Sequence, residues 1–262
     1  MSRAAIEVQN FSYRIRNVPI LRNITFEVPE NGFLSIVGPN GAGKTTLLKC
    51  LNRIYTGGEG RIRIHGNDLS TYPQKALAQR IAYVPQANGR QLPFTVFEFA
   101  LLARYPYLSP FSAARKEDRQ AVHDALALTD MKSFAERPLN TLSGGEQQKV
   151  FITAALAQQA GIMLLDEPTT FLDPLHQADI FRILKRINAE AGATIVMVTH
   201  DINSAVLISD RILALRNGQV MCCKNSAELM ENGLLSRIYG KEFVFMEHPR
   251  TGQKIVAPEG AP

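Results

Sequence analysis

One stretch decides the fold of this 262-residue chain: Gly38-Pro39-Asn40-Gly41-Ala42-Gly43-Lys44-Thr45-Thr46. It matches the pattern G-x-x-x-x-G-K-(S/T) at every fixed position. An apolar run, Phe33 to Val37, precedes it, and a helical pattern, Thr46 to Leu51, follows it. A strand, a glycine-rich loop and a helix in this order form a phosphate-binding loop, because the loop N–H groups and the helix N-terminus attract an anion.

Two side chains of this loop carry the expected chemistry. We expect Lys44 to reach the β- and γ-phosphates of a nucleotide and the Thr45 hydroxyl to ligate Mg²⁺. The flanking strand and helix argue against a chance glycine-rich turn. The candidate nucleotide-binding residues are therefore Gly38, Pro39, Asn40, Gly41, Ala42, Gly43, Lys44, Thr45 and Thr46.

Composition sets limits on the class of protein. The chain is 45% hydrophobic, which is ample for one large domain or two closely joined lobes. The net charge of +5 suits a nucleotide, an anionic lipid or nucleic acid, but a solvated basic surface is the simpler interpretation. Cys50, Cys222 and Cys223 show no disulfide or metal spacing, which favours a reducing compartment. We expect neither a signal peptide nor a membrane span.

Alternating residues predict strands around the loop. Residues 6–28 alternate in short runs, and Arg61 to His65 predict an antiparallel hairpin beside the main sheet. Tyr13 falls in the polar turn that we expect between the first runs. It either stacks on an adenine or is an ordinary residue at a strand end.

Two carboxylates follow an apolar run, Ile162 to Leu165, that predicts a buried parallel strand. The carboxyl ends of such strands line ligand crevices. We expect Asp166 to hold Mg²⁺, directly or through water, and Glu167 to act as the general base for water. A chance Asp-Glu pair is the alternative, and it is rarer after a phosphate loop.

Two further polar residues follow predicted strands. His200 comes after the run Thr194 to Val198, where it would bond the γ-phosphate and orient Glu167, or simply cap the helix 202–208. Gln86 follows the short strand Ile81 to Val84, and its amide would touch Mg²⁺ or the attacking water. Neither residue is diagnostic alone.

The region 95–158 differs in character and predicts an inserted helical lobe. Helices are expected over Thr95–Ala103 and Ser112–Leu128, around an aromatic break at Tyr105–Phe111 that closes a core or docks a partner. Ser143 caps a third helix that runs to about Gln158, and the two glycines after it either let a phosphate approach or belong to plain helix capping. Further on, we expect a helix over 226–238 and a frayed tail from Phe243 to Ala257.

Together these motifs resemble the ATP-binding subunit of an ABC transporter over essentially the whole chain. Leu142-Ser143-Gly144-Gly145-Glu146-Gln147 matches the family signature LSGGxQ. The resemblance implies roles for five sites: Tyr13 stacks on adenine, Gln86 is the Q-loop residue, Asp166-Glu167 end the Walker B strand, Asp173 belongs to the D-loop, and His200 is the switch histidine.

The resemblance also implies the architecture. We expect an α/β P-loop NTPase core of the ABC type, with a mainly parallel sheet, an antiparallel β subdomain and an inserted α-helical subdomain. The single domain spans residues 1–262. About 1–90 and 160–240 form the core, about 91–159 the helical subdomain, and 241–262 a C-terminal tail.

The family binds ATP and Mg²⁺ between two head-to-tail copies. The phosphate loop of one copy then faces Ser143, Gly144 and Gly145 of the other, so ATP joins the dimer and hydrolysis releases it. The chain holds one phosphate loop and one Asp-Glu strand, so two sites need two copies.

A narrower resemblance is to the ATPases of type II importers for iron chelates, haem and vitamin B12. It rests on Tyr83–Gln86, Leu92–Tyr107 and His248–Gln253, of which the second lies where the family docks a permease coupling helix. The sequence departs from the family pattern without removing a phosphate, metal or water contact. The departures are Phe171, Ala154, Ala103 and Lys224.

We therefore expect an ATPase that powers uptake of an iron-siderophore, haem or cobalamin through a separate membrane permease. Its expected partners are a second copy, an integral permease dimer and, indirectly, a substrate-binding protein, with no nucleic acid. It would lie peripherally on the cytoplasmic face of the membrane. The alternatives are a soluble ABC ATPase of translation or DNA repair, which usually has two cassettes or large insertions, and an exporter ATPase, which is often fused to membrane spans.

Overall fold

A six-stranded sheet places the phosphate loop at its centre. The computed structural model describes residues 3–86, 92–109, 112–230, 233–247, 249, 252 and 254–260. The strand order is β10-β9-β3-β8-β7-β6, and all pairings are parallel except β9 with β10. The bounds are β3 Phe33–Val37, β6 Ile81–Val84, β7 Ile162–Asp166, β8 Thr194–Val198, β9 Arg211–Arg216 and β10 Gln219–Lys224.

A second, antiparallel sheet lies beside the first, in the order β2-β1-β4-β5. Its bounds are β1 Ala4–Ile15, β2 Val18–Pro29, β4 Glu59–Ile64 and β5 Asn67–Asp68. Tyr13 lies within β1, opposite Leu21, so its predicted place in a turn is wrong. Register shifts along the β1–β2 pair interrupt the alternation without ending the strands, and the chain turns only at Arg16 and Asn17, both with left-handed φ.

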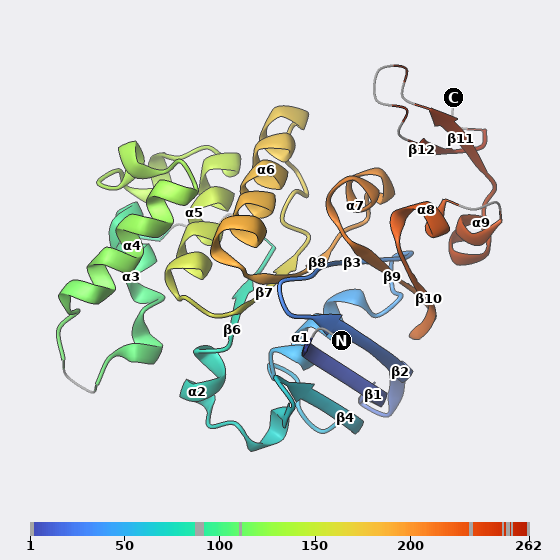
Figure 1. Ribbon diagram of the computed structural model, residues 1–262, viewed down its shortest axis with the longest axis horizontal. Helices are drawn as coiled ribbons and strands as arrows, with labels where there is room; N and C mark the ends of the chain where they lie inside the picture. Colours follow the sequence, from blue (N-terminus) through green and yellow to red (C-terminus); the bar gives the residue numbers. More distant parts are fainter. Residues whose placement is uncertain are drawn as a thin grey trace.

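Some helices cover the main sheet, and others lie beyond its edge strand β6 (Figure 1). The core helices are α1 Lys44–Leu51, α2 Gln74–Ala78, α6 Pro174–Ala191 and α7 Ile202–Ile208. The sequence analysis predicted no helix over α6, the longest helix in the described part of the chain. Its signals are nevertheless regular: Asp173 caps its start, Gly192 ends it in a left-handed conformation, and its buried residues recur at helical spacing, Ile180, Ile183, Leu184 and Ile187.

Three helices form the group inserted between β6 and β7: α3 Val96–Leu102, α4 Lys116–Leu128 and α5 Gly144–Ala157. They share an apolar cluster of their own, which includes Val96, Val122 and Val150. The prediction that the second helix begins at Ser112 is wrong. It begins at Lys116, because the Asp118 carboxylate accepts a hydrogen bond from the Arg115 N–H and fixes the first turn there (2.9 Å).

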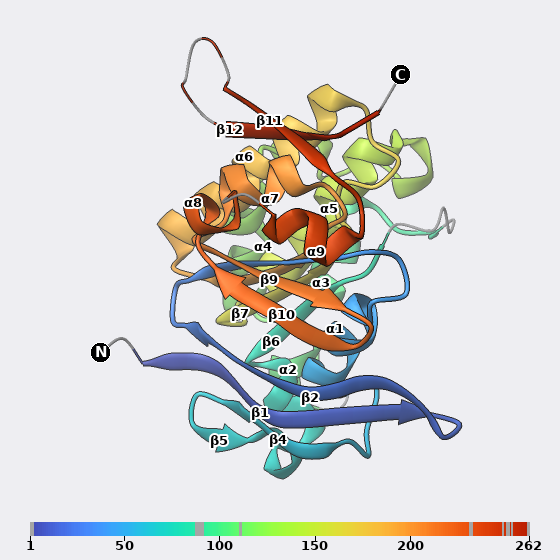
Figure 2. The ribbon, with the colours of Figure 1, turned by 90° about the vertical axis from the view of Figure 1, so that its right-hand side faces the viewer.

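The C-terminal region is more ordered than the sequence indicates. The predicted helix 226–238 is two helices, α8 Ser226–Leu229 and α9 Leu234–Tyr239, and Gly233 adopts a left-handed φ of 85° before the second. The predicted frayed tail is wrong, because β11 Phe243–Glu247 and β12 Lys254–Pro258 pair as an antiparallel hairpin. The hairpin lies beyond α7 and α9, opposite the antiparallel sheet (Figure 2).

The predicted α/β fold class is confirmed. A mainly parallel sheet, an antiparallel sheet and an inserted helical group are all present. Across the described ranges, no helix combines the length and the apolar character that a membrane crossing requires.

A buried ion pair ties the inserted helices together. Arg104 and Asp118 are each 4% exposed, and Arg104 Nε donates to Asp118 Oδ1 at 3.0 Å. Arg104 Nη1 also donates to the carbonyl oxygen of Ala157 (2.9 Å) at the end of α5. One guanidinium thus joins α4, α5 and the turn after α3.

Arg104→Met should lower the free energy of unfolding by about 3 kcal/mol, because it leaves the Asp118 carboxylate buried without its cation. Urea unfolding of the purified protein measures this. Arg182→Met is the matched control. Arg182 also binds two carboxylates, but in solvent, so its loss should cost less than about 1 kcal/mol. Equal costs for the two variants would contradict the assignment.

Candidate functional site

The phosphate loop surrounds a cavity at the carboxyl end of β3. The cavity has a volume of about 410 Å³, and its lining comprises Ile20, Asn40–Thr46 and Glu167. Gly38 begins the loop with φ 143°, and a β-carbon there would overlap the carbonyl oxygen of Leu215. Only glycine therefore fits at this first position, and the loop N–H groups can turn toward one point.

Lys44 is buried within the loop that it belongs to. Its Nζ donates to the carbonyl oxygens of Gly38 (2.8 Å) and Pro39 (3.1 Å). Burial lowers the pKa of Lys44, and the nearby carboxylates of Glu167 and Asp166 oppose that shift. An ammonium has three donors, and two are used within the described residues, which leaves one for a phosphate oxygen.

Asp166 joins the loop to the neighbouring strand. Thr45 Oγ1 donates to Asp166 Oδ1 at 2.9 Å, and Tyr83 Oη donates to Asp166 Oδ2 at 3.1 Å. Burial raises the pKa of the Asp166 carboxyl, although both hydrogen bonds oppose the rise. A hydroxyl and a carboxylate that meet beside a phosphate loop are oxygen donors of the kind Mg²⁺ takes. The donor set therefore fits Mg²⁺. Phosphate and water would complete the coordination of the ion, since the described residues hold no group of three His, Cys, Asp or Glu side chains that could bind a metal.

The sequence analysis did not identify Tyr83 as a site residue. It lies on β6, which pairs with β7 so that Tyr83 is opposite Leu164, two residues before Asp166. The one sign in the sequence was that Tyr83 lies next to the last residue of the predicted strand 81–84, near the edge of the sheet where the other site residues lie.

Glu167 and His200 face each other at the ends of two neighbouring strands. His200 Nδ1 lies 3.7 Å from Glu167 Oε2, and Thr170 Oγ1 donates to the same carboxylate oxygen at 2.9 Å. Glu167 adopts a left-handed φ of 49°, and its N–H donates to the carbonyl oxygen of Val198. This strained backbone points the carboxylate into the cavity that the loop lines.

Gln86 is not brought into this group. Its side chain is exposed and makes no hydrogen bond to any residue that the structure describes. The segment that follows it, residues 87–91, lies outside the described residues. Its predicted role at the metal stays a prediction.

Tyr13 stacks on another aromatic ring. The rings of Tyr13 and Tyr55 are 5.7 Å apart at an interplanar angle of 3°. Burial raises the pKa of the Tyr13 hydroxyl. One face of Tyr13 is thus covered by Tyr55, and the predicted adenine contact would use the other face.

The signature segment forms a separate group, away from the loop of its own chain. Ser143 caps α5, since its N–H donates to Glu146 (2.7 Å) and its Oγ accepts from the Glu146 N–H (3.3 Å). A β-carbon at Gly145 would overlap the ring of His176, whose Nδ1 lies 2.7 Å from Asp173 Oδ2. His176, which packs beside Gly145, was not predicted from the sequence as a residue of this group. None of these residues lines the cavity of the phosphate loop.

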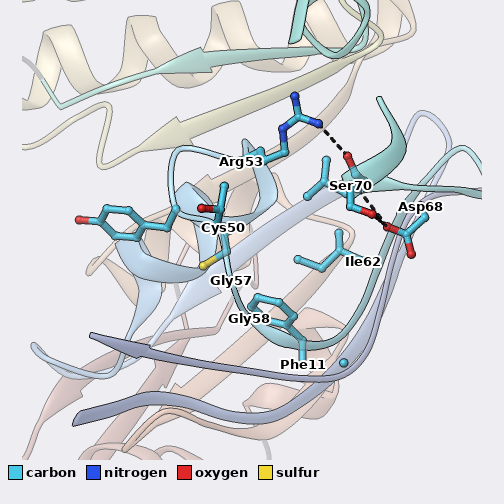
Figure 3. A pocket seen from close by; sticks show the side chains of 12 residues that line it. Phe11, Cys50, Arg53, Gly57, Gly58, Ile62, Asp68 and Ser70 are labelled. Carbon is cyan, nitrogen blue, oxygen red and sulfur yellow. Dashed lines mark hydrogen bonds between the residues drawn. The ribbon is translucent and has the colours of Figure 1, made fainter. Parts of the chain in front are cut away.

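Another cavity lies beside the end of α1 (Figure 3). It has a volume of about 460 Å³ and shares no lining residue with the phosphate loop. Arg53 is the cation on its wall, but the guanidinium already donates to the carbonyl oxygen of Leu69 (3.2 Å) and to Gln74 Oε1 (2.8 Å). The cavity is therefore separate from the phosphate loop, although Tyr55 on its wall stacks on Tyr13.

Comparison with known proteins identifies the family of the chain. Residues 21–170 match the family model described as ABC transporter. The ferric enterobactin transport ATP-binding protein FepC of Escherichia coli (strain K12) is 38% identical over 92% of this chain and 89% of that protein. The hemin import ATP-binding protein HmuV of Streptomyces coelicolor is 39% identical over 93% of this chain and 86% of that protein.

Two solved structures superimpose on this chain over most of its length. The ATP-binding cassette MJ0796, in a dimeric post-hydrolysis state bound to ADP and Pi, superimposes with a TM-score of 0.72 at 30% identity, over 84% of this chain and 98% of that one. A metal-chelate type ABC transporter in an inward-facing conformation superimposes with a TM-score of 0.86 at 24% identity, over 98% and 97% of the two chains. At that identity the second likeness concerns the fold alone.

Without Mg²⁺ and nucleotide, Asp166→Asn should raise the melting temperature at pH 7 by about 2 °C or more. The folded pKa of Asp166 lies above its ordinary value of 3.8, so its ionised form destabilises the folded state once the pH exceeds that value. The advantage should therefore shrink as the pH falls toward 4. Thermal unfolding in EDTA across this range measures it, and a variant less stable than the parent at pH 7 would contradict the analysis.

Proposed function

This chain belongs to the ABC transporter family, and from this premise we propose that it powers import of a ferric siderophore or haem through a separate membrane permease. It is an ATPase of that family. The proposal is supported by three relatives that match over at least 90% of this chain and are named for enterobactin, hemin and hydroxamate import. Cobalamin, the third cargo expected from the sequence, has no such support among these names.

One observation carries the assignment to ATP hydrolysis. Lys44, Thr45 and Glu167 line one cavity, and Asp166 accepts a hydrogen bond from Thr45, so that the ends of two neighbouring elements, the loop after β3 and the end of β7, meet there. We assign Lys44 to the phosphates, Thr45, Asp166 and Gln86 to Mg²⁺, and Tyr13 to the adenine. The loop from Gly38 to Thr46 would surround the phosphates with N–H groups.

The chemistry follows from Glu167 and His200. Glu167 accepts the proton of the attacking water, and the Thr170 hydroxyl, which donates to Glu167 Oε2, holds the carboxylate in place. His200, within reach of Glu167, donates to the γ-phosphate oxygens as their charge develops, together with Lys44. Bound Mg²⁺ would neutralise the phosphate oxygens during the transfer.

A second copy of the chain would complete the site. The signature residues Ser143–Gly145 lie apart from the phosphate loop, so the head-to-tail dimer brings each to the loop of the other copy. Two large apolar side chains near them point to solvent: Phe171 is 90% exposed and Leu175 is 82% exposed. A partner copy would cover them, together with Asp173 of the D-loop.

The proposed permease contact lies on the inserted helices. Leu102, the last residue of α3, is 53% exposed, and Tyr105, three residues further on, is 74% exposed. Gln79 Nε2 donates to the carbonyl oxygen of Pro106 (2.9 Å), so α2 of the core holds this turn. A permease helix seated here would communicate with both parts of a single ABC domain and would hold the chain on the cytoplasmic face of the membrane.

Glu167→Gln should bind ATP like the parent and lower kcat for hydrolysis by at least about 100-fold, because it removes the general base. A phosphate-release assay and a fluorescent-nucleotide titration measure the two effects. The same substitution in the producing cells should abolish uptake of radiolabelled ferric siderophore or haem.

Glu190→Gln, an exposed carboxylate at the end of α6, is the matched control and should leave both assays unchanged. Brisk turnover by Glu167→Gln would refute the assignment of the base. Normal uptake by cells with a hydrolysis-dead chain would refute the import function.

A further inference from the structure

The C-terminal hairpin is fastened to the helix that follows the switch histidine. β12 lies against α7 (Figures 1 and 2). Val256 of β12 is 6% exposed and packs with Ile202 and Ala205 of α7 and with Leu235 of α9. This apolar contact attaches β12 to the core.

The side chain of Asn203 adds two hydrogen bonds to that apolar contact. Asn203 Nδ2 donates to the carbonyl oxygen of Val256 at 3.0 Å, and the Val256 N–H donates to Asn203 Oδ1 at 2.9 Å. The amide thus pairs with both polar groups of one strand residue, as a neighbouring strand would. These two bonds fix the rotation of α7 relative to the hairpin, which apolar packing alone does not do.

Asn203 lies three residues after His200. Asp201 caps α7 by accepting the Asn203 N–H at 3.0 Å and the Ser204 hydroxyl. Because the cap and the helix start are rigidly joined, any rotation of α7 moves the backbone of His200. The 3.7 Å approach of His200 to Glu167 therefore depends on the position of α7.

Tyr239 at the end of α9 makes the second connection. Its hydroxyl is buried, it faces the N–H of Gly38 at the start of the phosphate loop, and it lies near Asp201. Burial raises the pKa of Tyr239 to about 12, so the hydroxyl keeps its proton. No hydrogen bond to this oxygen closes within the described residues, although the ring is held by an edge contact with Phe243 at 5.7 Å. A buried hydroxyl without a partner is costly, and it would gain one if Gly38 or Asp201 moved slightly.

We propose that the C-terminal region formed by α9, β11 and β12 positions His200 for hydrolysis, with Tyr239 of this region and Asn203 of α7 as the positioning residues. This region holds the switch helix through Asn203, and it places the buried Tyr239 hydroxyl near Asp201 and the N–H of Gly38. It sets the rate of the chemical step without contacting the nucleotide. The inference rests on the proposed role of His200.

The test measures kcat and KM for ATP in four variants of the full chain. Asn203→Ala should lower kcat by about fivefold and leave KM within about twofold, since mutations along such a connection change coupling but not binding. Asn188→Ala is the matched control. Asn188 also donates two hydrogen bonds to backbone carbonyls, of Asn31 and Ala193, but it lies on α6. It should lose similar stability and keep the parental kcat.

Tyr239→Phe separates positioning from folding. It removes a hydroxyl without a hydrogen-bond partner, so its melting temperature should equal or exceed that of the parent, while kcat falls. Hydrogen exchange of the peptide 199–208 should be faster in Asn203→Ala than in Asn188→Ala. A kcat of Asn203→Ala equal to that of Asn188→Ala overturns the proposal, and so does a parental kcat of Tyr239→Phe.

His200→Ala distinguishes this inference from the function on which it rests. If His200→Ala lowers kcat while the Asn203 and Tyr239 variants do not, the positioning role fails and the proposed mechanism stands. If His200→Ala keeps the parental kcat, the assigned role of His200 fails, and the positioning proposal is overturned with it.

Discussion

Two buried charges at the carboxyl end of the main sheet, Lys44 and Asp166, are the constraint on which the rest of the structure depends. Their burial costs free energy unless hydrogen bonds compensate for the lost water. Carbonyl oxygens of the phosphate loop compensate Lys44, and the hydroxyls of Thr45 and Tyr83 compensate Asp166. The apolar strands on either side hold these partners in place, and a polyanion with its cation would replace part of the lost hydration.

The sequence predicted the local features of the fold and missed those set by distant contacts. The phosphate loop from Gly38 to Thr46 was predictable, because its glycines, the apolar run before it and the helical pattern after it leave few other structures for this segment. Tyr13 was placed in a turn because register shifts between β1 and β2 hide the length of both strands. The C-terminal hairpin was missed because its packing against α7 and its bonds to Asn203 are contacts between residues about 50 positions apart in the sequence.

The candidate site shows the same division. Lys44, Thr45, Asp166, Glu167 and His200 were found because each follows a predicted strand or belongs to a motif, and parallel strands bring their ends together. Tyr83 and His176 were missed because their roles arise from a neighbouring strand and from a helix packed across the chain. The signature residues lie away from the phosphate loop of their own chain, and in the proposed dimer they would serve the loop of the other copy.

Affinity purification of the tagged chain from its own cells in a gentle detergent tests the central claim most directly. The account predicts that a multi-span membrane protein is recovered at one subunit per ATPase, and that ferric siderophore or haem stimulates ATP turnover of the reconstituted complex. It also predicts that Tyr105→Ser loses this partner while Val18→Ser, a change of another large side chain that is more than half exposed, retains it. Recovery of ribosomal or DNA-repair proteins without a membrane protein would contradict the import function.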